Sequence, residues 1–514
     1  MQWLPILGGV VVVLLLWALF DVMQRKHAII HNFPILGHFR YWLENIGPEL
    51  RQYIVTSNNE ERPFSRDQRR WVYASSKSEN NTFGFGTDND LETSPNYVII
   101  KHAAFPIPDR KPDEPGYDPR FPIPCAKVLG AARGRKHAFR PESVVNISGM
   151  SFGSLSGRAV ESLNRGAKLA GCLHNSGEGG VSRHHQHGGA LVWQIGTAYF
   201  GCRDAQGRFE LEKFLDVVAA NPIRAIEIKL SQGAKPGLGG LLPASKITRE
   251  IADIRGIPLG KNCASPSCHS EFHDVDSLLD FVERLADRTG LPVGIKSAVG
   301  EIAFWEQLAR RMRETGKGVD FITIDGGEGG TGAAPLVFSD HVALPFKLAM
   351  ARVYPKFVAE GLHEQIVFIG SGKLGFPEAA LLGFALGCDA INVGREAMLA
   401  IGCIQALRCH SGHCPTGVAT QNRWLVRGVH PGLKSVRVAN YLVTLRKELL
   451  QVSRACGALH PALITTDHFE ILEENFQWRS AGQCFQYQPE WGLPSTDDCR
   501  QIEQIMRGET TAAA

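Results

Sequence analysis

Three cysteines stand close together late in the 514-residue chain, at Cys403, Cys409 and Cys414. Five residues separate the first two and four separate the second two, in a segment with little regular apolar pattern. Cysteine sulfurs at such spacing ligate tetrahedral zinc or an iron–sulfur cluster. Zinc prefers four ligands, and His410 or His413 could supply the fourth. Spacing alone therefore leaves both kinds of metal centre open.

Two glycine-rich turns precede the cysteines, and each follows an apolar run directly. The first turn contains Gly370, Ser371 and Gly372, and the second contains Gly394 and Arg395. Backbone N–H groups in such turns can point at a phosphate, and the arginine fork matches phosphate geometry. A phosphate cradle beside three thiolates indicates a flavin and an iron–sulfur centre that exchange electrons.

Lysines end two other apolar runs. Lys229 ends one run and is followed closely by Gln232 and Lys235, while Lys296 ends another. An ammonium at the end of a buried strand needs a partner, because burial of an unpaired charge is costly. A bound anion supplies such a partner, so these lysines are candidates for a binding site.

Eight short apolar runs alternate with amphipathic, helix-like segments from residue 144 onward. The runs lie at residues 144–148, 172–175, 191–195, 225–229, 292–296, 321–324, 366–369 and 390–393. Eight strand–helix units predict an α/β fold of the (β/α)8 TIM-barrel type. A doubly wound open sheet is the alternative, but it normally carries one glycine fingerprint after its first strand. Here glycine-rich turns follow nearly every run, which favours the barrel.

Two of the strand-end loops complete the candidate site. Residues 149–154 include Met150 and Ser151, and residues 175–180 include Glu178. Small residues in these loops let the backbone approach a flat ligand closely. The loops after strands seven and eight of such barrels often bind phosphate, and the two glycine-rich turns occupy those positions. We therefore expect all these residues on one face of the barrel.

The amino terminus contains 18 uncharged residues, Trp3 to Phe20. A helix of that length nearly spans the hydrocarbon core of a bilayer, about 30 Å. A cleaved signal peptide would need positive charge before the apolar run and small residues at a cleavage site, and neither is present. A buried hydrophobic helix is the other alternative. Because Arg25 and Lys26 follow the segment, we expect a single-pass inner (plasma) membrane protein whose catalytic body faces the cytoplasm.

The rest of the chain divides by composition. We expect a transmembrane anchor at 1–24, an irregular cap rich in proline and arginine at 25–142, the barrel at 143–424 and a helical tail at 425–514. The formal charge is +3, which gives no support to nucleic acid binding. Twelve cysteines are too dilute for a disulfide scaffold and indicate a reducing compartment.

Several of these motifs together resemble the synthase region of glutamate synthase. They are residues 150–154, 175–180, 229–237 and 325–335 and the cysteine segment as far as Gln421, within roughly 144–422. The resemblance implies FMN as the flavin and a [3Fe–4S] cluster rather than zinc. It also implies that 2-oxoglutarate and ammonia form an imino acid, which reduced FMN converts to L-glutamate.

In that chemistry the imine carbon must lie against the flavin and cations must hold the dicarboxylate. We expect Lys235 to clamp the substrate, Gln232 to hydrogen-bond the ring or the substrate, and Glu178 to transfer protons to the imine. The catalytic candidates are Glu178, Lys235 and Gln232, the cofactor-binding candidates are Met150, Ser151, Lys229, Lys296, Gly370, Ser371, Gly372, Gly394 and Arg395, and the metal ligands are Cys403, Cys409 and Cys414. Lys296 is the candidate for stabilising the negative charge of reduced flavin near N1.

The chain also departs from the family pattern. The complete enzyme begins with an amidotransferase domain whose nucleophile is an amino-terminal cysteine, whereas Gln2 follows the initiator here. We therefore expect ammonia from solution or from an amidotransferase partner, and electrons from a separate donor protein. Two alternatives stay open: an FMN and iron–sulfur oxidoreductase acting on another imino, oxo or hydroxy acid, and a non-catalytic membrane electron-transfer subunit.

Overall fold

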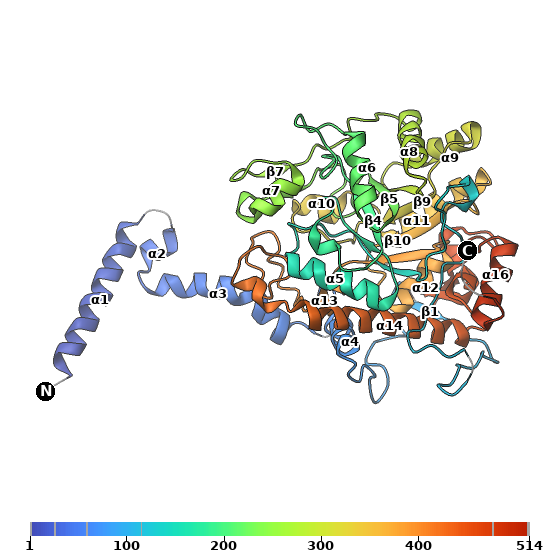
Figure 1. Cartoon of the computed structure of the whole chain (residues 1–514). Helices are drawn as coiled ribbons and strands as arrows, with labels where there is room; N and C mark the ends of the chain where they lie inside the picture. The colour runs from blue at the N-terminus through green and yellow to red at the C-terminus, as the bar shows by residue number, and fades with distance from the viewer. Residues whose placement is uncertain (1–2, 25–26, 58–59, 115, 475–476, 511–514) are drawn as a thin grey trace. The chain divides into compact units, whose positions relative to one another are not determined.

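The computed structural model describes residues 3–24, 27–57, 60–114, 116–474 and 477–510 (Figure 1). The chain forms two compact units, residues 1–69 and residues 70–514, which are described separately. Arg25 and Lys26, on which the predicted membrane orientation depends, lie outside the described residues.

The amino-terminal unit begins with the predicted apolar helix. It contains α1 (Leu4–Met23), α2 (Ala28–Asn32), α3 (Leu36–Leu50) and a π-helical turn at Arg51–Val55. The segment Pro5–Met23 of α1 is long and apolar enough to cross a membrane, and nearly all of it is exposed. A core helix would be buried, so the buried-helix alternative is wrong for this segment.

The segment predicted to be irregular, 25–142, contains regular helices. The helix α3 has 15 residues, and α4 (Arg66–Lys77) has 12. The prolines that led to the prediction gather between residues 106 and 124, beyond both helices, where the structure has turns and bends. A proline disrupts only the helix in which it stands, so the distant cluster does not prevent these two, and α3 accommodates Pro48 in its last turn.

The eight predicted strands form a closed parallel barrel in the order β10-β11-β2-β3-β4-β5-β8-β9. They are β2 (Val145–Ile147), β3 (His174–Asn175), β4 (Leu191–Ile195), β5 (Ile223–Lys229), β8 (Val293–Ser297), β9 (Phe321–Asp325), β10 (Val367–Ser371) and β11 (Ala390–Val393). Each end lies within two residues of its prediction. The (β/α)8 fold is confirmed, and the doubly wound sheet is wrong.

Helices cover the outside of the barrel. They are α5 (Gly157–Ala170), α6 (Leu211–Ala220), α8 (Val275–Thr289), α9 (Ala303–Thr315), α11 (Phe346–Ala359), α12 (Pro377–Ala385) and α13 (Arg395–Ala400). The helix α8 shows why they form: the Asp274 carboxylate caps its start by accepting from the Ser277 N–H at 2.8 Å, and Gly290 ends it in the left-handed region. Its buried face includes Leu278, Phe281 and Leu285.

Two excursions interrupt the strand–helix alternation. Between β5 and β8 the chain forms an antiparallel pair, β6 (Leu241–Leu242) and β7 (Cys263–Ala264), with α7 (Arg249–Arg255) between them. After β9 comes the short helix α10 (Leu336–His341). Both excursions follow the carboxyl ends of strands, where the site residues are expected.

The carboxyl-terminal segment is only partly the predicted helical tail. It contains α14 (Pro431–Ala455), α15 (Ala481–Phe485) and α16 (Thr496–Arg507), but also β12 (Phe469–Leu472) and β13 (Trp478–Ser480). These two strands form a small antiparallel sheet with β1 (Val98–Ile100), so the tail is not entirely helical. In Figure 1, α14 lies along α5. A Cβ on Gly166 of α5 would lie 2.0 Å from Val438 Cγ1, so glycine permits this close packing.

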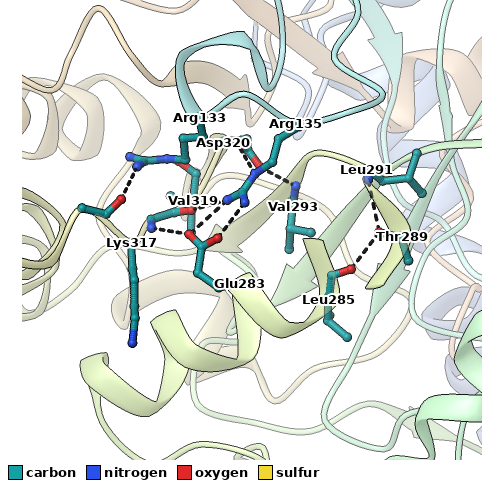
Figure 2. A network of polar contacts seen from close by, with 12 residues as sticks. Arg133, Arg135, Glu283, Leu285, Thr289, Leu291, Val293, Lys317, Val319 and Asp320 are labelled. Carbon is teal, nitrogen blue, oxygen red and sulfur yellow. Dashed lines mark hydrogen bonds and ion pairs between the residues drawn. The ribbon is translucent and has the colours of Figure 1, made fainter. Parts of the chain in front are cut away.

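A polar network ties the amino-terminal end of the barrel together (Figure 2). Arg135 donates to both carboxylate oxygens of Glu283 in α8, at 2.6 and 3.1 Å, and to Asp320 just before β9. Asp320 in turn accepts from the Val293 N–H at the start of β8, at 2.7 Å. Buried charges need such complete pairing. The arrangement joins one outer helix to two strands.

Candidate active site

The carboxyl ends of the barrel strands carry the predicted lysines. Lys229, the last residue of β5, is the register partner of Lys296 in β8. Asp325, the last residue of β9, is the register partner of Ser371, the last residue of β10. Because parallel strands present their carboxyl ends at one rim, the barrel gathers these four residues on one face, where enzymes of this fold have their active sites.

Polar contacts link the loops that follow β3, β5 and β9. Lys229 Nζ lies 3.1 Å from Glu178 Oε1 and donates to Gln232 Oε1 at 3.0 Å. Gln232 Nε2 donates to the Gly330 carbonyl at 2.7 Å. The structure thus brings together three predicted residues, Glu178, Lys229 and Gln232. Glu178 precedes Lys229 by 51 positions in the sequence, and Gln232 follows Lys229 by 3.

Opposing charges set the ionisation of Glu178. Burial acts to raise the pKa of its carboxyl, but attraction to Lys229, with smaller contributions from Lys235 and Arg255, outweighs burial. The pKa of Glu178 therefore lies below its ordinary value, and the side chain is a carboxylate near neutral pH. A general acid at this position would need a raised pKa, so the geometry favours a base or an electrostatic partner for a cation.

Lys235 lies close to this ion pair. It is 8% exposed, and burial, followed by repulsion from Lys229, lowers its pKa, while Glu178 acts in the opposite direction. Within the described part of the chain, its ammonium has no hydrogen bond and no ion pair. A buried cation without a protein partner is suited to holding an anionic ligand.

Arg255, at the end of α7, is a buried cation that sequence reasoning missed. Its Nη2 donates to the Phe152 carbonyl at 3.0 Å, and its guanidinium lies 4.9 Å from the centre of the Phe200 ring. Its Nε is buried and has no hydrogen-bond partner. The excursion 241–264 carries this residue to the Glu178 side of the site. A lone arginine at the end of a short helix gives no signal in the sequence.

Lys296 is paired with a carboxylate from the next strand. Its Nζ lies 3.7 Å from Asp325 Oδ1, and Asp325 Oδ2 accepts from the Gly233 N–H at 2.8 Å. A Cβ on Gly233 would lie 1.9 Å from the Gly326 carbonyl oxygen. Only glycine fits there, so the loops after β5 and β9 are held in close backbone contact.

The two predicted phosphate turns lie side by side after β10 and β11. Ser371 is buried, and its carbonyl accepts from the Gly326 N–H at 2.8 Å. Gly372 has φ of 130°, a region that favours glycine. Arg395 begins α13 directly after Gly394. The structure brings these residues together with Gly370, which is buried in β10 behind the turn.

Arg395 extends over the loop after β9. Its Nη2 donates to the Glu328 carbonyl at 2.5 Å, and a Cβ on Gly330 would lie 2.5 Å from its Cδ. Burial lowers the pKa of the guanidinium, while Glu396, Asp325 and Glu328 act in the opposite direction. The side chain joins two loops of the rim.

Met150 and Ser151 lie in the loop after β2. Ser151 Oγ donates to Ser154 Oγ at 3.0 Å, and a Cβ on Gly177 would lie 2.5 Å from the Ser151 nitrogen. Met150 Sδ lies 4.0 Å from the position that a Cβ on Gly394 would take. The loop is therefore next to both the Glu178 loop and the second phosphate turn.

A polar network inside the barrel supports the rim from below. Glu227 of β5 is 1% exposed and accepts from Asn175 Nδ2 at 2.7 Å, Gln194 Nε2 at 2.6 Å and Thr323 Oγ1 at 2.7 Å. These donors come from β3, β4 and β9. A Cβ on Gly149 would lie within 2.9 Å of both Asn175 and Gln194, so the network directly contacts the loop after β2. In the sequence, each of the four residues of this network is a polar residue within one of the apolar runs that form β3, β4, β5 and β9.

The cysteine segment packs on the same rim. Gln421 Nε2 donates to the Leu155 carbonyl at 2.8 Å, and the Ser156 N–H donates to the Val418 carbonyl at 2.9 Å. From the excursion 241–264, Lys246 Nζ donates to the carbonyls of Cys409 and Ala419, at 2.6 and 2.9 Å. The segment is thus held against the loop that contains Ser151.

Two of the three predicted ligands influence each other's ionisation. Burial, followed by repulsion from Cys414, raises the pKa of Cys409. Burial acts to raise the pKa of Cys414, but hydrogen bonds from the Ala419, Thr416 and Val418 backbone and from the Thr416 hydroxyl lower it overall. Among the described residues, however, no three His, Cys, Asp or Glu side chains are gathered closely enough to hold a metal ion.

The architecture defines the class of protein first. A closed parallel barrel with paired lysines and carboxylates at its carboxyl-terminal rim is that of a (β/α)8-barrel enzyme. Residues 131–458 match the conserved region in glutamate synthase. A glutamate synthase large subunit-like protein of Bacillus subtilis is 38% identical over 495 residues, which cover 90% of this chain and 94% of that protein. The chain therefore belongs to the glutamate synthase family.

Other relatives match over the barrel and its surroundings. An archaeal glutamate synthase (NADPH) of Methanocaldococcus jannaschii is 35% identical over 319 residues, 62% of this chain and 59% of that protein. An archaeal-type glutamate synthase (NADPH) of Thermotoga maritima is 32% identical over 320 residues, 62% and 60% of the two chains. The match thus spans less than two thirds of these two relatives.

Proposed function

We propose that this chain is an FMN-dependent oxidoreductase that reductively aminates 2-oxoglutarate to L-glutamate. The observation that supports it best is the ion pair between Glu178 and Lys229, beside the unpaired ammonium of Lys235 and the buried guanidinium of Arg255. Three cations around one ionised carboxylate suit a dicarboxylate substrate that must exchange protons.

The residues at the rim fit FMN. The turns at Ser371–Gly372 and Gly394–Arg395 offer backbone N–H groups and one guanidinium to a phosphate at the ends of the last two strands, the usual position in this fold. Lys296, held by Asp325, is suited to the negative charge that a reduced flavin carries. Met150, Ser151 and Lys229 would lie along the ring. When bound and reduced, FMN supplies the hydride.

The chain's own residues would prepare the imine. We assign Lys235 and Arg255 to the substrate carboxylates. Ammonium must lose a proton before its nitrogen attacks the keto carbon, and the ionised Glu178 can accept it. The addition gives a carbinolamine, and Glu178 can return the same proton to its hydroxyl, which leaves as water. Glu178 is then a carboxylate again and stabilises the positive charge of the protonated imine, the form that accepts a hydride. Hydride addition to that carbon completes L-glutamate, while Gln232 orients the substrate or the ring.

A [3Fe–4S] cluster held by Cys403, Cys409 and Cys414 is part of the proposal on narrower grounds. The N–H groups aimed at Cys414 and the cation of Lys246 nearby suit thiolate ligands, whose charge they offset. Among the described residues, no three His, Cys, Asp or Glu side chains are gathered closely enough to hold a metal ion. No catalytic step is therefore derived through it.

The remaining parts of the proposal concern location and partners. We assign α1 to a single-pass anchor in the inner (plasma) membrane, with the barrel on the cytoplasmic side. Its length, composition and exposure support an anchor, and an uncleaved or cleaved signal would share the first two properties. Electrons would come from a separate donor protein, and ammonia from solution or from an amidotransferase partner.

The test is anaerobic single turnover. The protein is purified without oxygen and its flavin is identified and reduced, after which 2-oxoglutarate and ammonium are added together and separately. We expect the absorbance of oxidised flavin to return only with both, and L-glutamate to form in an amount equal to the flavin. Reoxidation by a different oxo or imino acid would make that acid the substrate in place of 2-oxoglutarate. Reoxidation by no acid would support a non-catalytic electron-transfer subunit.

A further inference from the structure

The helix α3 exposes an apolar stripe. Leu36, Phe39, Trp42, Leu43 and Leu50 are between 40 and 76% exposed. At 100° per residue, these five positions fall within an arc of about 120°. The stripe continues beyond the helix through Ile54 and Val55, both 74% exposed. An apolar surface of this extent, on a single face, marks an interaction site.

The other faces of α3 either pack within the same unit or carry polar side chains. Gly37 packs against Ile30 of α2, where a Cβ would lie 2.8 Å from the Ile30 Cα. The ring of Tyr41 lies 5.0 Å from that of His27. On the exposed polar side, Arg40 pairs with Glu44 at 2.9 Å. Among the described residues of α3, the exposed apolar side chains thus gather on the stripe.

A buried carboxylate joins α3 to the end of α1. Asp21 accepts from the Ile35 N–H at 2.8 Å and lies 2.9 Å from His38 Nε2. Asp21 is fully buried, although its neighbours in α1 are exposed. This contact turns the chain where the apolar segment ends, so that α3 runs across the direction of α1 in Figure 1. A helix that crosses the axis of a membrane span at its end lies along the membrane surface.

The chemistry of the stripe favours lipid over protein. The helix α1 exposes apolar side chains all around, which is typical of a membrane span and not of a helix that docks one face in a groove. The Asp21 contact joins the start of α3 to the end of this span. Trp42 stacks on Phe39, with ring centres 5.7 Å apart, and such aromatic side chains are enriched at the membrane–water interface.

We propose that α3 is an interfacial helix, whose apolar face inserts into the boundary layer of the leaflet in which α1 ends. The inference rests on the proposed anchoring by α1 and goes beyond it. An amphipathic helix in the interfacial plane buries its apolar face among headgroups and upper acyl chains. Two membrane contacts restrain the tilt of the chain more than one span does.

The test is photo-crosslinking of the full-length chain in liposomes. A benzophenone side chain is introduced separately at Leu15 of α1, at Phe39 on the stripe, and at Glu44, on the polar face of the same helix. Adducts are identified by mass spectrometry. We expect lipid adducts at positions 15 and 39, and at least tenfold fewer at position 44.

The three positions distinguish the proposed anchor α1 from the proposed interfacial helix α3. Lipid at position 15 without lipid at position 39 overturns the interfacial helix and leaves the anchor intact. Lipid at 39 without lipid at 15 supports the interfacial helix and overturns the anchor. A protein adduct at position 39 overturns the inference in favour of a protein partner. Equal lipid labelling at 39 and 44 also overturns it, because no oriented face would then exist.

Discussion

Lys229 and Lys296 are register partners in neighbouring strands, yet each ammonium has a carboxylate of its own, Glu178 at 3.1 Å and Asp325 at 3.7 Å. The two carboxylates come from opposite sides of this strand pair, Glu178 from the loop after β3 and Asp325 from the end of β9. This separation lets two like charges stand side by side at one rim. In the proposed reaction, Glu178 would face the substrate, and Lys296, paired with Asp325, would face the reduced flavin.

Removal of Lys235 should impair substrate capture. In Lys235→Met the only buried ammonium without a partner in the described site is lost, so kcat/KM for 2-oxoglutarate should fall about 100-fold, or about 3 kcal/mol. Flavin content should be unchanged. Lys213→Met is the matched control, because that exposed lysine pairs with Glu210 on α6. Equal losses in both variants would contradict the assignment.

The ion pair between Lys229 and Glu178 should set the acidic limb of the pH profile of kcat/KM. Lys229 is the largest influence that lowers the pKa of Glu178, so in Lys229→Met burial dominates and the pKa rises. Activity that requires the carboxylate is lost as pH falls through this pKa, and the limb of kcat/KM should therefore move to higher pH. An unchanged limb, measured at saturating flavin, would exclude Glu178 as the titrating group.

The contact between the loops after β5 and β9 should depend on glycine. Gly233→Ala places a methyl 1.9 Å from the Gly326 carbonyl oxygen, so the Asp325 contact and the flavin site should be disrupted. We expect loss of bound flavin and a lower melting temperature. Gly300→Ala, where nothing lies within 4 Å of the added Cβ, is the control. Retention of flavin by Gly233→Ala would show that the loops can separate without harm.

Buried histidines should make the protein sensitive to mild acid. Burial lowers the pKa of His460 to about 4, and its ring accepts from the Ala462 N–H and contacts the Pro124 carbonyl. Below about pH 6.5 the unfolded chain binds a proton that the native chain does not. Stability should therefore be full above that pH and fall towards pH 4, by about 3 kcal/mol from this group. Between pH 7 and pH 5, the free energy of unfolding in urea should decrease less in His460→Gln than in the native protein. In His273→Gln, which replaces an exposed histidine, it should decrease as much as in the native protein.

Iron content should report the cysteine ligands. Cys403→Ala, Cys409→Ala and Cys414→Ala should each lose iron and acid-labile sulfide, while the exposed Cys268→Ala should keep both. Full iron content in Cys403→Ala would mean that a different residue completes the site. If the native protein contained zinc and no acid-labile sulfide, the site would be a zinc site and not an iron–sulfur cluster.

Much of the site could be predicted because its residues follow strands. Lys229 and Lys296 end apolar runs, and the carboxyl ends of parallel strands meet at one rim, so their proximity could be inferred from the pattern alone. The phosphate turns were found by the same rule. Arg255 and Lys246 could not be predicted by this rule, because they lie in the excursion 241–264. No periodicity there indicates which loop the segment packs against.

The sequence by itself determined the eight strands, their closure into a barrel and the family, since these depend on local hydrophobic periodicity and on residues adjacent in the chain. Only the tertiary structure decided which charges neutralise one another, that the pKa of Glu178 lies below its ordinary value, and that Lys246 binds the backbone of the cysteine segment. Those properties depend on distances between segments that are far apart in the chain. Electrostatic attraction and desolvation act over those distances, and the order of residues along the chain does not contain them.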